Sequence, residues 1–199
     1  MSDNNKKHDV DSGRRHFLTV ATTVTGVVGA VAAAAPFVLS LQPSARAQAL
    51  GAAVEVDVSK LEIGERIIVE WRGKPVWIIR RSEELIAKLA SVEGELRDPD
   101  SDESIQPEYA KNKGRAYSDK EEYLVLLGVC THLGCSPEFK PQPEAQLKAG
   151  GFLCACHGSR FDLAGRVYKS VPAPTNLTVP PYRYVAPTKI LVGDDTGAA

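Results

Sequence analysis

The most uniform feature of the chain is an apolar run near its beginning. No charged residue occurs from Phe17 to Ala45, a stretch of 29 residues, whereas about 20 apolar residues suffice to cross a bilayer as a helix. The stretch is rich in Ala, Val, Thr and Gly rather than Leu, so its tendency to insert is modest, and Pro36 can kink it. We predict a polar leader at residues 1–16 and a transmembrane anchor at residues 17–45.

Positive charges flank this run unequally. Lys6, Lys7, Arg14 and Arg15 precede it, whereas only Arg46 closely follows it. Positive flanks stay on the cytoplasmic side, so we expect a cytoplasmic N-terminus and a periplasmic domain in a bacterial inner membrane. The leader ends in Ser-Gly-Arg-Arg-His-Phe-Leu, which resembles the twin-arginine export signal.

Two readings exist for the end of the apolar run. Ala45-Arg46-Ala47 has the small-x-small form of a signal-peptidase site, and cleavage there would leave a chain that starts near Gln48. We favour an uncleaved anchor. Residues 46–53 are mostly small residues, and Arg46 is their one charged residue. We therefore expect them to form a flexible hinge before the domain at residues 54–199.

Alternation of apolar and polar residues predicts a mostly antiparallel β domain. Val54 to Val58 alternates as a half-buried strand does, and two apolar runs flank the turn Arg72-Gly73-Lys74, which indicates a hairpin. Ser82 can cap a helix that runs to about Leu96, and the charged stretch 97–120 predicts a loop-rich insertion. The expected strands are 54–58, 66–71, 75–80, 123–129, 151–153, 182–185 and 189–192.

Composition excludes one class of partner and shows where the candidate metal ligands lie in the chain. The chain has 24 basic and 25 acidic residues, so it has no electrostatic footprint for nucleic acid. All four cysteines and two of the four histidines fall between Cys130 and His157. His8 and His16 lie in the leader, where nothing around them suggests a metal site.

Two short segments hold this chemistry: Cys130-Thr131-His132-Leu133-Gly134-Cys135 and Cys154-Ala155-Cys156-His157-Gly158-Ser159. Each can offer one thiolate and one imidazole to a shared centre, and two of each suit either zinc or a [2Fe-2S] cluster. One further cysteine per segment favours the cluster, provided that these two pair and clamp the segments together. A thiol-disulfide oxidoreductase ranks last, because neither segment has its Cys-x-x-Cys spacing.

Both segments resemble the two signature boxes of the Rieske iron-sulfur family, in its quinol-oxidising branch of proteobacterial ubiquinol:cytochrome c reductases. The resemblance extends through three further segments, 96–99, 106–110 and 172–177. It implies a Rieske antiparallel β-sheet fold, with a small cluster-binding subdomain at about residues 125–175. It also implies one [2Fe-2S] cluster bound by Cys130 and Cys154 on one iron and by His132 and His157 on the other, with a Cys135–Cys156 disulfide.

Four neighbours of these ligands complete the expected site. Ser159 matches a family serine that donates a hydrogen bond to the cluster, although a serine can also only satisfy a turn. Leu133 is either an apolar cover of the cluster or a core leucine, and Gly134 permits a tight turn. Phe161 stands where many relatives have a Tyr donor, so we expect a lower redox potential. A further departure is Ser170 with Val171, where relatives often have glycine.

The resemblance implies an electron-transfer function in a respiratory complex. His157, together with His132, would contact ubiquinol held in cytochrome b and couple electron to proton transfer, and the reduced domain would then move to cytochrome c1 and pass on its electron. We expect a membrane-bound, dimeric complex. A Rieske oxygenase is disfavoured, because the domain has no further histidine for a second iron. A Rieske subunit of another periplasmic oxidase, such as arsenite oxidase, remains the alternative.

Overall fold

The computed structural model describes residues 11–194 and 196, and it divides the chain into two compact units, Met1–Gln48 and Ala49–Ala199. Each unit is described by itself. His8 lies outside the described residues.

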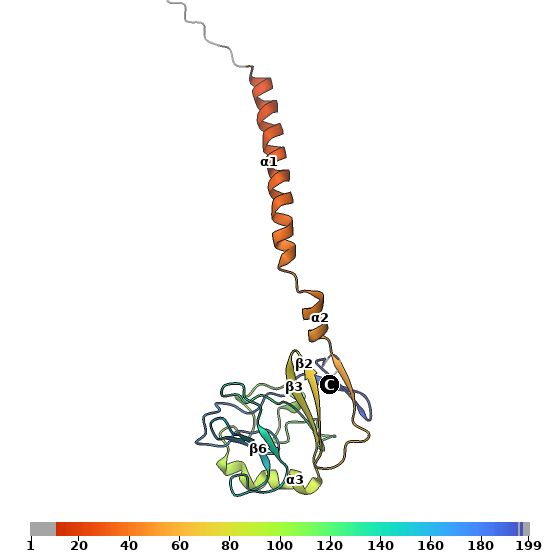
Figure 1. Ribbon diagram of the computed structural model, residues 1–199, viewed down its shortest axis with the longest axis vertical. Coiled ribbons are helices and arrows are strands. Elements are labelled where there is room, and N and C mark those ends of the chain that lie inside the picture. Colours follow the sequence, from red (N-terminus) through yellow and green to blue (C-terminus); the bar gives the residue numbers. More distant parts are fainter. Residues whose placement is uncertain (1–10, 195, 197–199) are drawn as a thin grey trace, which may run out of the picture. The chain divides into compact units, whose positions relative to one another are not determined.

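The N-terminal unit is dominated by one helix, α1 (Ser12–Ser40), drawn in red and orange in Figure 1. The Asp11 carboxylate caps it by accepting hydrogen bonds from the N–H groups of Gly13 and Arg14. Thr22 and Thr25 donate their hydroxyl protons to the carbonyls four residues earlier, at 2.7 and 2.8 Å. Their polar groups are therefore satisfied within the helix, as an apolar surrounding requires.

Helix α1 is long and apolar enough to cross a membrane. An apolar stretch of 18 residues within it has a mean hydropathy of 1.8, and none of that stretch is buried. It begins at Ser12, within the segment expected as leader, and it contains Pro36. A second short helix, α2 (Ala45–Gly51), occupies most of the segment 46–53 for which we expect a hinge. The hinge and the retention of the anchor stay predictions.

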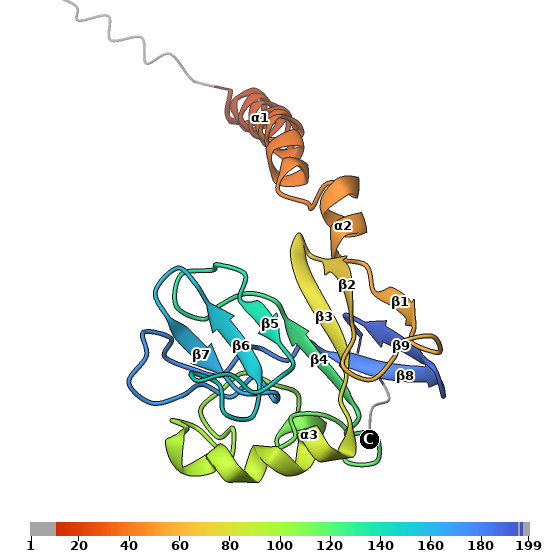
Figure 2. The same ribbon diagram turned by 60° about the horizontal axis from the view of Figure 1, so that its bottom comes forward.

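Three antiparallel sheets of three strands each form the second unit. Their orders are β1-β9-β8, β2-β3-β4 and β5-β6-β7, and Figure 2 shows the sheet β2-β3-β4 between the other two. The antiparallel β fold expected from the sequence is thus confirmed. The strands are β1 (Val54–Asp57), β2 (Arg66–Trp71), β3 (Lys74–Arg80), β4 (Tyr123–Leu127), β5 (Glu138–Lys140), β6 (Gly151–Cys154), β7 (Ser159–Phe161), β8 (Tyr182–Ala186) and β9 (Lys189–Val192).

The central sheet leads directly to the first cysteine. Strands β2 and β3 form the expected hairpin, whose turn residues Arg72 and Gly73 have φ values of 52° and 69°, as the tight turns of hairpins require. Strand β4 pairs with β3 and is almost wholly buried, and it ends shortly before Cys130. At Gly128, a Cβ would overlap the ring of Trp77, so only glycine lets the chain leave the strand there.

Strands β6 and β7 hold the second cysteine in a hairpin. Cys154 pairs in register with Ser159, and Phe152 pairs with Phe161. The Phe152 ring also stacks on Trp77, with 5.3 Å between the ring centroids. This contact joins the β5-β6-β7 sheet to the central one, so one hydrophobic core supports both cysteine segments.

The helix after Ser82 follows the prediction only in its first part. The Ser82 hydroxyl caps α3 (Glu83–Lys88) by accepting from the Leu85 N–H at 3.2 Å, as expected. The predicted α-helix to about Leu96 is wrong beyond that point, because a 3₁₀ helix, η1 (Leu89–Glu95), follows. Its sequence includes Ser91, Val92 and Gly94, which have low helix propensity.

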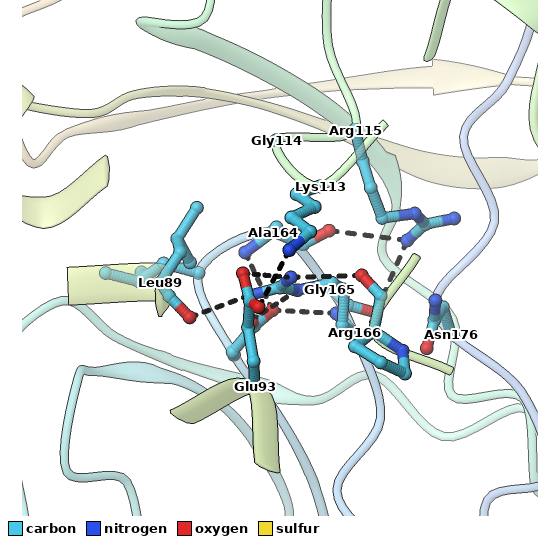
Figure 3. Close-up of polar contacts among 12 residues, drawn as sticks. Leu89, Glu93, Lys113, Gly114, Arg115, Ala164, Gly165, Arg166 and Asn176 are labelled. Carbon is cyan, nitrogen blue, oxygen red and sulfur yellow. Dashed lines mark hydrogen bonds and ion pairs between the residues drawn. The ribbon is translucent and has the colours of Figure 1, made fainter. Parts of the chain in front are cut away.

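The segment 97–120 contains only one regular element, the 3₁₀ helix η2 (Glu108–Ala110), which fits the expected loop-rich insertion. Charged side chains in and around this segment are more deeply buried than its charge indicated. Arg115 within it, and Arg81 and Arg166 outside it, are at most 2% exposed. Each donates hydrogen bonds to backbone carbonyls of neighbouring segments. Figure 3 shows Arg115 and Arg166 in these contacts.

Asp162 provides the fully buried carboxylate of this network. Its Oδ2 accepts from the Arg166 Nε at 2.7 Å, while its Oδ1 accepts from two backbone N–H groups. Burial lowers the pKa of Arg81 and of Arg115 to about 10, and Asp162 opposes both shifts. The network ties the insertion to the turn that follows β7.

Candidate iron-sulfur centre

The two cysteine segments form loops of the same shape. The first follows β4 and the second connects β6 to β7. The Gly134 N–H donates to the Cys130 carbonyl at 3.0 Å, and the Gly158 N–H donates to the Cys154 carbonyl at 2.9 Å. Both glycines have positive φ values, 85° and 73°, and a Cβ at either would meet nothing within 4 Å. Glycine is therefore needed for the turn itself rather than for space in the protein.

The four cysteines divide into two kinds. Cys135 and Cys156 form the disulfide that the resemblance implied, with 6.8 Å between their Cα atoms. It joins the two loops near the surface, because Cys135 is half-buried and Cys156 is exposed. Cys130 and Cys154 are free thiols, and each is only 2% exposed.

The two histidines lie close to each other on the outer side of this pair. Their ring centroids are 4.7 Å apart, and the ring planes meet at 88°. His132 is half-buried and His157 is exposed. On these two loops the free thiols thus lie inside and the imidazoles lie outside.

The surroundings of Cys130 suit a sulfur ligand. Burial raises the pKa of its thiol, and the neighbouring Cys154 thiol raises it further. Hydrogen bonds to the sulfur from the His132 backbone N–H and the Ser159 hydroxyl act in the opposite direction and lower this pKa. A metal centre with thiolate ligands requires buried thiols that lie in contact and accept hydrogen bonds, and Cys130 with Cys154 meets this requirement.

Ser159 combines the two roles considered for it. Its side chain is fully buried, and its Oγ accepts a hydrogen bond from the Ala173 N–H at 3.0 Å. It therefore satisfies a backbone group of another loop while its own proton remains available for the sulfur of Cys130.

Residues 171–177, which we call the proline loop, lie against both cysteine loops. The Thr131 hydroxyl donates to the Thr175 carbonyl at 2.7 Å, and Ser159 accepts from Ala173. Sequence reasoning placed this segment in the family resemblance but did not identify these contacts. The signal available in the sequence was one hydroxyl residue in each cysteine segment, Thr131 in the first and Ser159 in the second.

Leu133 and Phe161 differ sharply in burial. Leu133 is 72% exposed, so it is not a core leucine, and its role as a cover stays a prediction. Phe161 is fully buried in the hydrophobic core, in register with Phe152. Its ring offers no hydrogen-bond donor to a ligand sulfur.

The distances between cysteine sulfurs alone would select a different set of candidate metal ligands. The Sγ atoms of Cys135, Cys154 and Cys156 lie within 4.8 Å of one another. Two of them share the disulfide and cannot act as thiolate ligands. Only Cys154 of this trio is free to bind a metal, and its natural partner is the other buried thiol, Cys130.

Comparison with known proteins places the chain in a family. The Rieske [2Fe-2S] domain family matches residues 53–183, which contain both cysteine loops. A second family, described as the ubiquitinol-cytochrome C reductase Fe-S subunit TAT signal, matches residues 4–44. The "Ubiquinol-cytochrome c reductase iron-sulfur subunit" of Allochromatium vinosum is 55% identical over 194 residues, covering 96% of this chain and 93% of that protein.

The chain belongs to the Rieske iron-sulfur family. The protein of the same name from Bradyrhizobium diazoefficiens is 42% identical over 181 residues, covering 90% of this chain and 94% of its own length. A solved chain titled "Hyperthermophilic respiratory Complex III" is 28% identical and covers 86% of this chain and 98% of its own, with a TM-score of 0.48.

Membership of the Rieske family decides the cofactor. It is a [2Fe-2S] cluster rather than zinc, and the two buried thiols and two outer imidazoles of this chain fit the mixed ligand set of such a cluster. The Rieske subunits of ubiquinol-cytochrome c reductase are the branch of the family to which it is similar over nearly its whole length.

Proposed function

We propose that this Rieske chain is the membrane-anchored electron-transfer subunit of a quinol:cytochrome c oxidoreductase. It would take one electron, with a coupled proton, from ubiquinol and pass the electron to cytochrome c1. The observation that carries the proposal is the division of the site into two buried free thiols and two outer imidazoles on loops closed by a disulfide.

The ligands follow from this division. Cys130 and Cys154 would bind the inner iron, because they are the free and buried thiols of the described residues. His132 and His157 would bind the outer iron, since their rings are neighbours on the exposed side. When bound, the cluster supplies one-electron chemistry at a potential of roughly −150 to +300 mV, which histidine ligation raises.

The exposed histidine gives the chain its contact with a reductant. One nitrogen of an imidazole can bind metal while the other remains available for a hydrogen bond. The exposed His157 can therefore accept a proton from a quinol hydroxyl, with His132 as its less exposed neighbour. The exposed Leu133 next to them would exclude water from this contact.

The finer membrane arrangement rests on sequence and on α1. Arg14 and Arg15 lie at the start of α1, so the N-terminus would be cytoplasmic and the Rieske domain periplasmic in the bacterial inner membrane. The partners would be cytochrome b and cytochrome c1 in a dimeric complex, with membrane lipid around α1. The segment 46–53 would let the domain move between the two cytochromes.

Low-temperature EPR of dithionite-reduced membranes tests the ligand set. We expect a mixed-ligand [2Fe-2S] signal in the parent chain and its loss in Cys130→Ser and His132→Ala, with Lys169→Ala, an exposed residue after β7, as a matched control. Zinc instead of iron and sulfide in the purified protein would contradict the proposal. Copurification with cytochromes b and c1 separates it from an arsenite oxidase subunit.

Mass analysis of the intact protein tests the anchor. We expect a mass that includes residues 17–45, extracted from membranes only by detergent. A mature chain that starts near Gln48 would show that the apolar segment is a cleaved signal.

A further inference from the structure

The proline loop has few hydrogen bonds of its own. Pro172 and Pro174 have no N–H. The backbone N–H groups of Ala173, Asn176 and Leu177 all donate outside the loop, to Ser159, Ser104 and Gly165 respectively. Its position over the cysteine loops therefore depends on the segments that it contacts.

One of these segments is a turn organised by Asp98. The Asp98 Oδ1 accepts from the Asp102 N–H at 2.8 Å. Its Oδ2 accepts from the Glu103 N–H at 3.3 Å and from the Ser104 hydroxyl at 2.6 Å. Asp98 is 6% exposed. Its carboxylate accepts the hydrogen bonds that close residues 98–104, which we call the Asp98 turn.

Asn176 connects this turn to the proline loop. Its side chain is 1% exposed. Its Nδ2 donates to the Asp98 carbonyl at 3.0 Å and to the Ser101 hydroxyl at 3.1 Å, with the Asp98 carboxylate 3.3 Å away. Its Oδ1 accepts from the Val167 N–H at 2.8 Å. Every polar group of the side chain is therefore used between segments distant in sequence.

The residue before Asn176 contacts the first cysteine loop. Thr175 accepts, through its carbonyl, the hydroxyl proton of Thr131, which stands between Cys130 and His132. Two residues further back, the Ala173 N–H bonds to Ser159. A displacement of Asn176 would therefore move one contact on each cysteine loop.

We propose that Asn176, held by the Asp98 turn, is a positioning residue for the iron-sulfur centre. It fixes the proline loop at the distance where Thr175 meets Thr131 and Ala173 meets Ser159. The assignment rests on the ligand set proposed above. The side-chain hydrogen bonds of Asn176 go to Val167, Asp98 and Ser101 and to none of the cysteines or histidines. Its effect is therefore transmitted through the loop.

Asn176→Ala, compared with Asn112→Ala, tests this role in membranes that contain the complete complex. Asn112 is a matched control, because its Nδ2 also bridges two backbone carbonyls, of Tyr109 and Ala116, but within the insertion. Both variants lose side-chain hydrogen bonds, which are buried at Asn176 and part-buried at Asn112, and both are expected to unfold at lower temperature. The measurements are iron and sulfide content, the midpoint potential by EPR titration, turnover per cluster, and amide hydrogen exchange of the peptide that covers residues 171–177.

We expect only Asn176→Ala to lower the midpoint potential, to change the EPR line shape and to speed hydrogen exchange in the proline loop. Its turnover per cluster should fall on the order of 10-fold, within the roughly 100-fold that a misplacement of about 1 Å can cost. If Asn176→Ala prevents folding, Ser104→Ala removes two hydrogen bonds of the same network, one to the Asp98 carboxylate and one from the Asn176 N–H. It should show smaller changes in the same direction.

An unchanged potential, line shape and loop exchange in Asn176→Ala, or equal changes in Asn112→Ala, would overturn the proposal. So would Ser104→Ala if it keeps all three parental values. Because these values are read only from chains that retain their cluster, this failure differs from failure of the ligand set, which would appear as absence of the mixed-ligand signal in the parent chain.

Discussion

The hydroxyl oxygen of Ser159 accepts a hydrogen bond from the N–H of Ala173 at 3.0 Å, inside a fully buried site. Because the oxygen is the acceptor there, the hydroxyl proton is left for another partner, and the sulfur of Cys130 lies in hydrogen-bond contact with it. One side chain thus connects the second cysteine loop, the first cysteine and the proline loop.

Ser159→Ala should lower the redox potential. A hydrogen bond to a charged group contributes about 1.5–3 kcal/mol, and about 1.4 kcal/mol corresponds to about 59 mV for one electron. We expect a decrease of about 60–130 mV, because the reduced and more negative centre loses its donor. Redox titration by EPR measures it, and Ser159→Thr, which keeps the hydroxyl, should recover part of the decrease. An unshifted potential in a chain with full cluster content would contradict this role.

Phe161→Tyr should raise the potential. Phe161 is fully buried, so an added hydroxyl must find a partner or cost about 1–3 kcal/mol of stability. By resemblance to relatives with Tyr, we expect that partner to be a cysteine ligand sulfur. Protein-film voltammetry measures the shift, and thermal unfolding shows whether the hydroxyl is paired. A less stable chain with no upward shift would show that the hydroxyl does not reach the sulfur.

Tyr168→Phe should remove a stability loss at high pH. Burial raises the pKa of the Tyr168 phenol from 10.0 to about 12, with Asp162 and Glu95 adding to the shift. Between pH 10 and 12 the folded state therefore holds a proton that the unfolded state has lost, and stability falls as pH rises through this window. Its hydroxyl has no hydrogen-bond partner among the described residues. Denaturant titrations at pH 8 and pH 11 should show a smaller difference in the variant, and an equal difference would contradict the assignment.

Ser170→Gly should stabilise the chain. Ser170 is exposed and has a φ of 58°, in the left-handed region. That conformation costs a residue with a Cβ roughly 1–2 kcal/mol, of which the flexibility of glycine in the unfolded chain offsets about 0.5–1 kcal/mol. We expect a net gain of about 0.5–1 kcal/mol in chemical denaturation, with Lys169→Gly at a neighbouring exposed position as a destabilising control. Loss of stability in Ser170→Gly would show that the serine has an unrecognised contact.

The sequence predicted those parts of the fold that depend on residues close to one another in the chain. Strict alternation identified β1, and the apolar runs around Arg72-Gly73 identified the β2–β3 hairpin. The cysteines and histidines were identified because each loop carries its own pair within six residues. The Cys135–Cys156 pairing came from resemblance alone, because four cysteines permit three pairings.

The remaining features depend on contacts between distant segments. Strands β5 and β7 have three residues each, which is too short to show a period. Arg115 and Asp98 look like surface charges in a sequence, and only the folded chain shows that both are buried. For the same reason the sequence does not show Asn176 as the buried link between two segments.

The difference in depth between the two pairs of cysteines has a consequence for biogenesis. Cys130 and Cys154 are neighbours and chemically able to bond to each other, whereas the exposed Cys156 meets any oxidant first. A bridge between Cys130 and Cys154 would use up both thiolates that the cluster needs, so the burial of these two thiols protects the centre from oxidation before iron arrives. The folded chain thus sorts four chemically identical thiols by their accessibility.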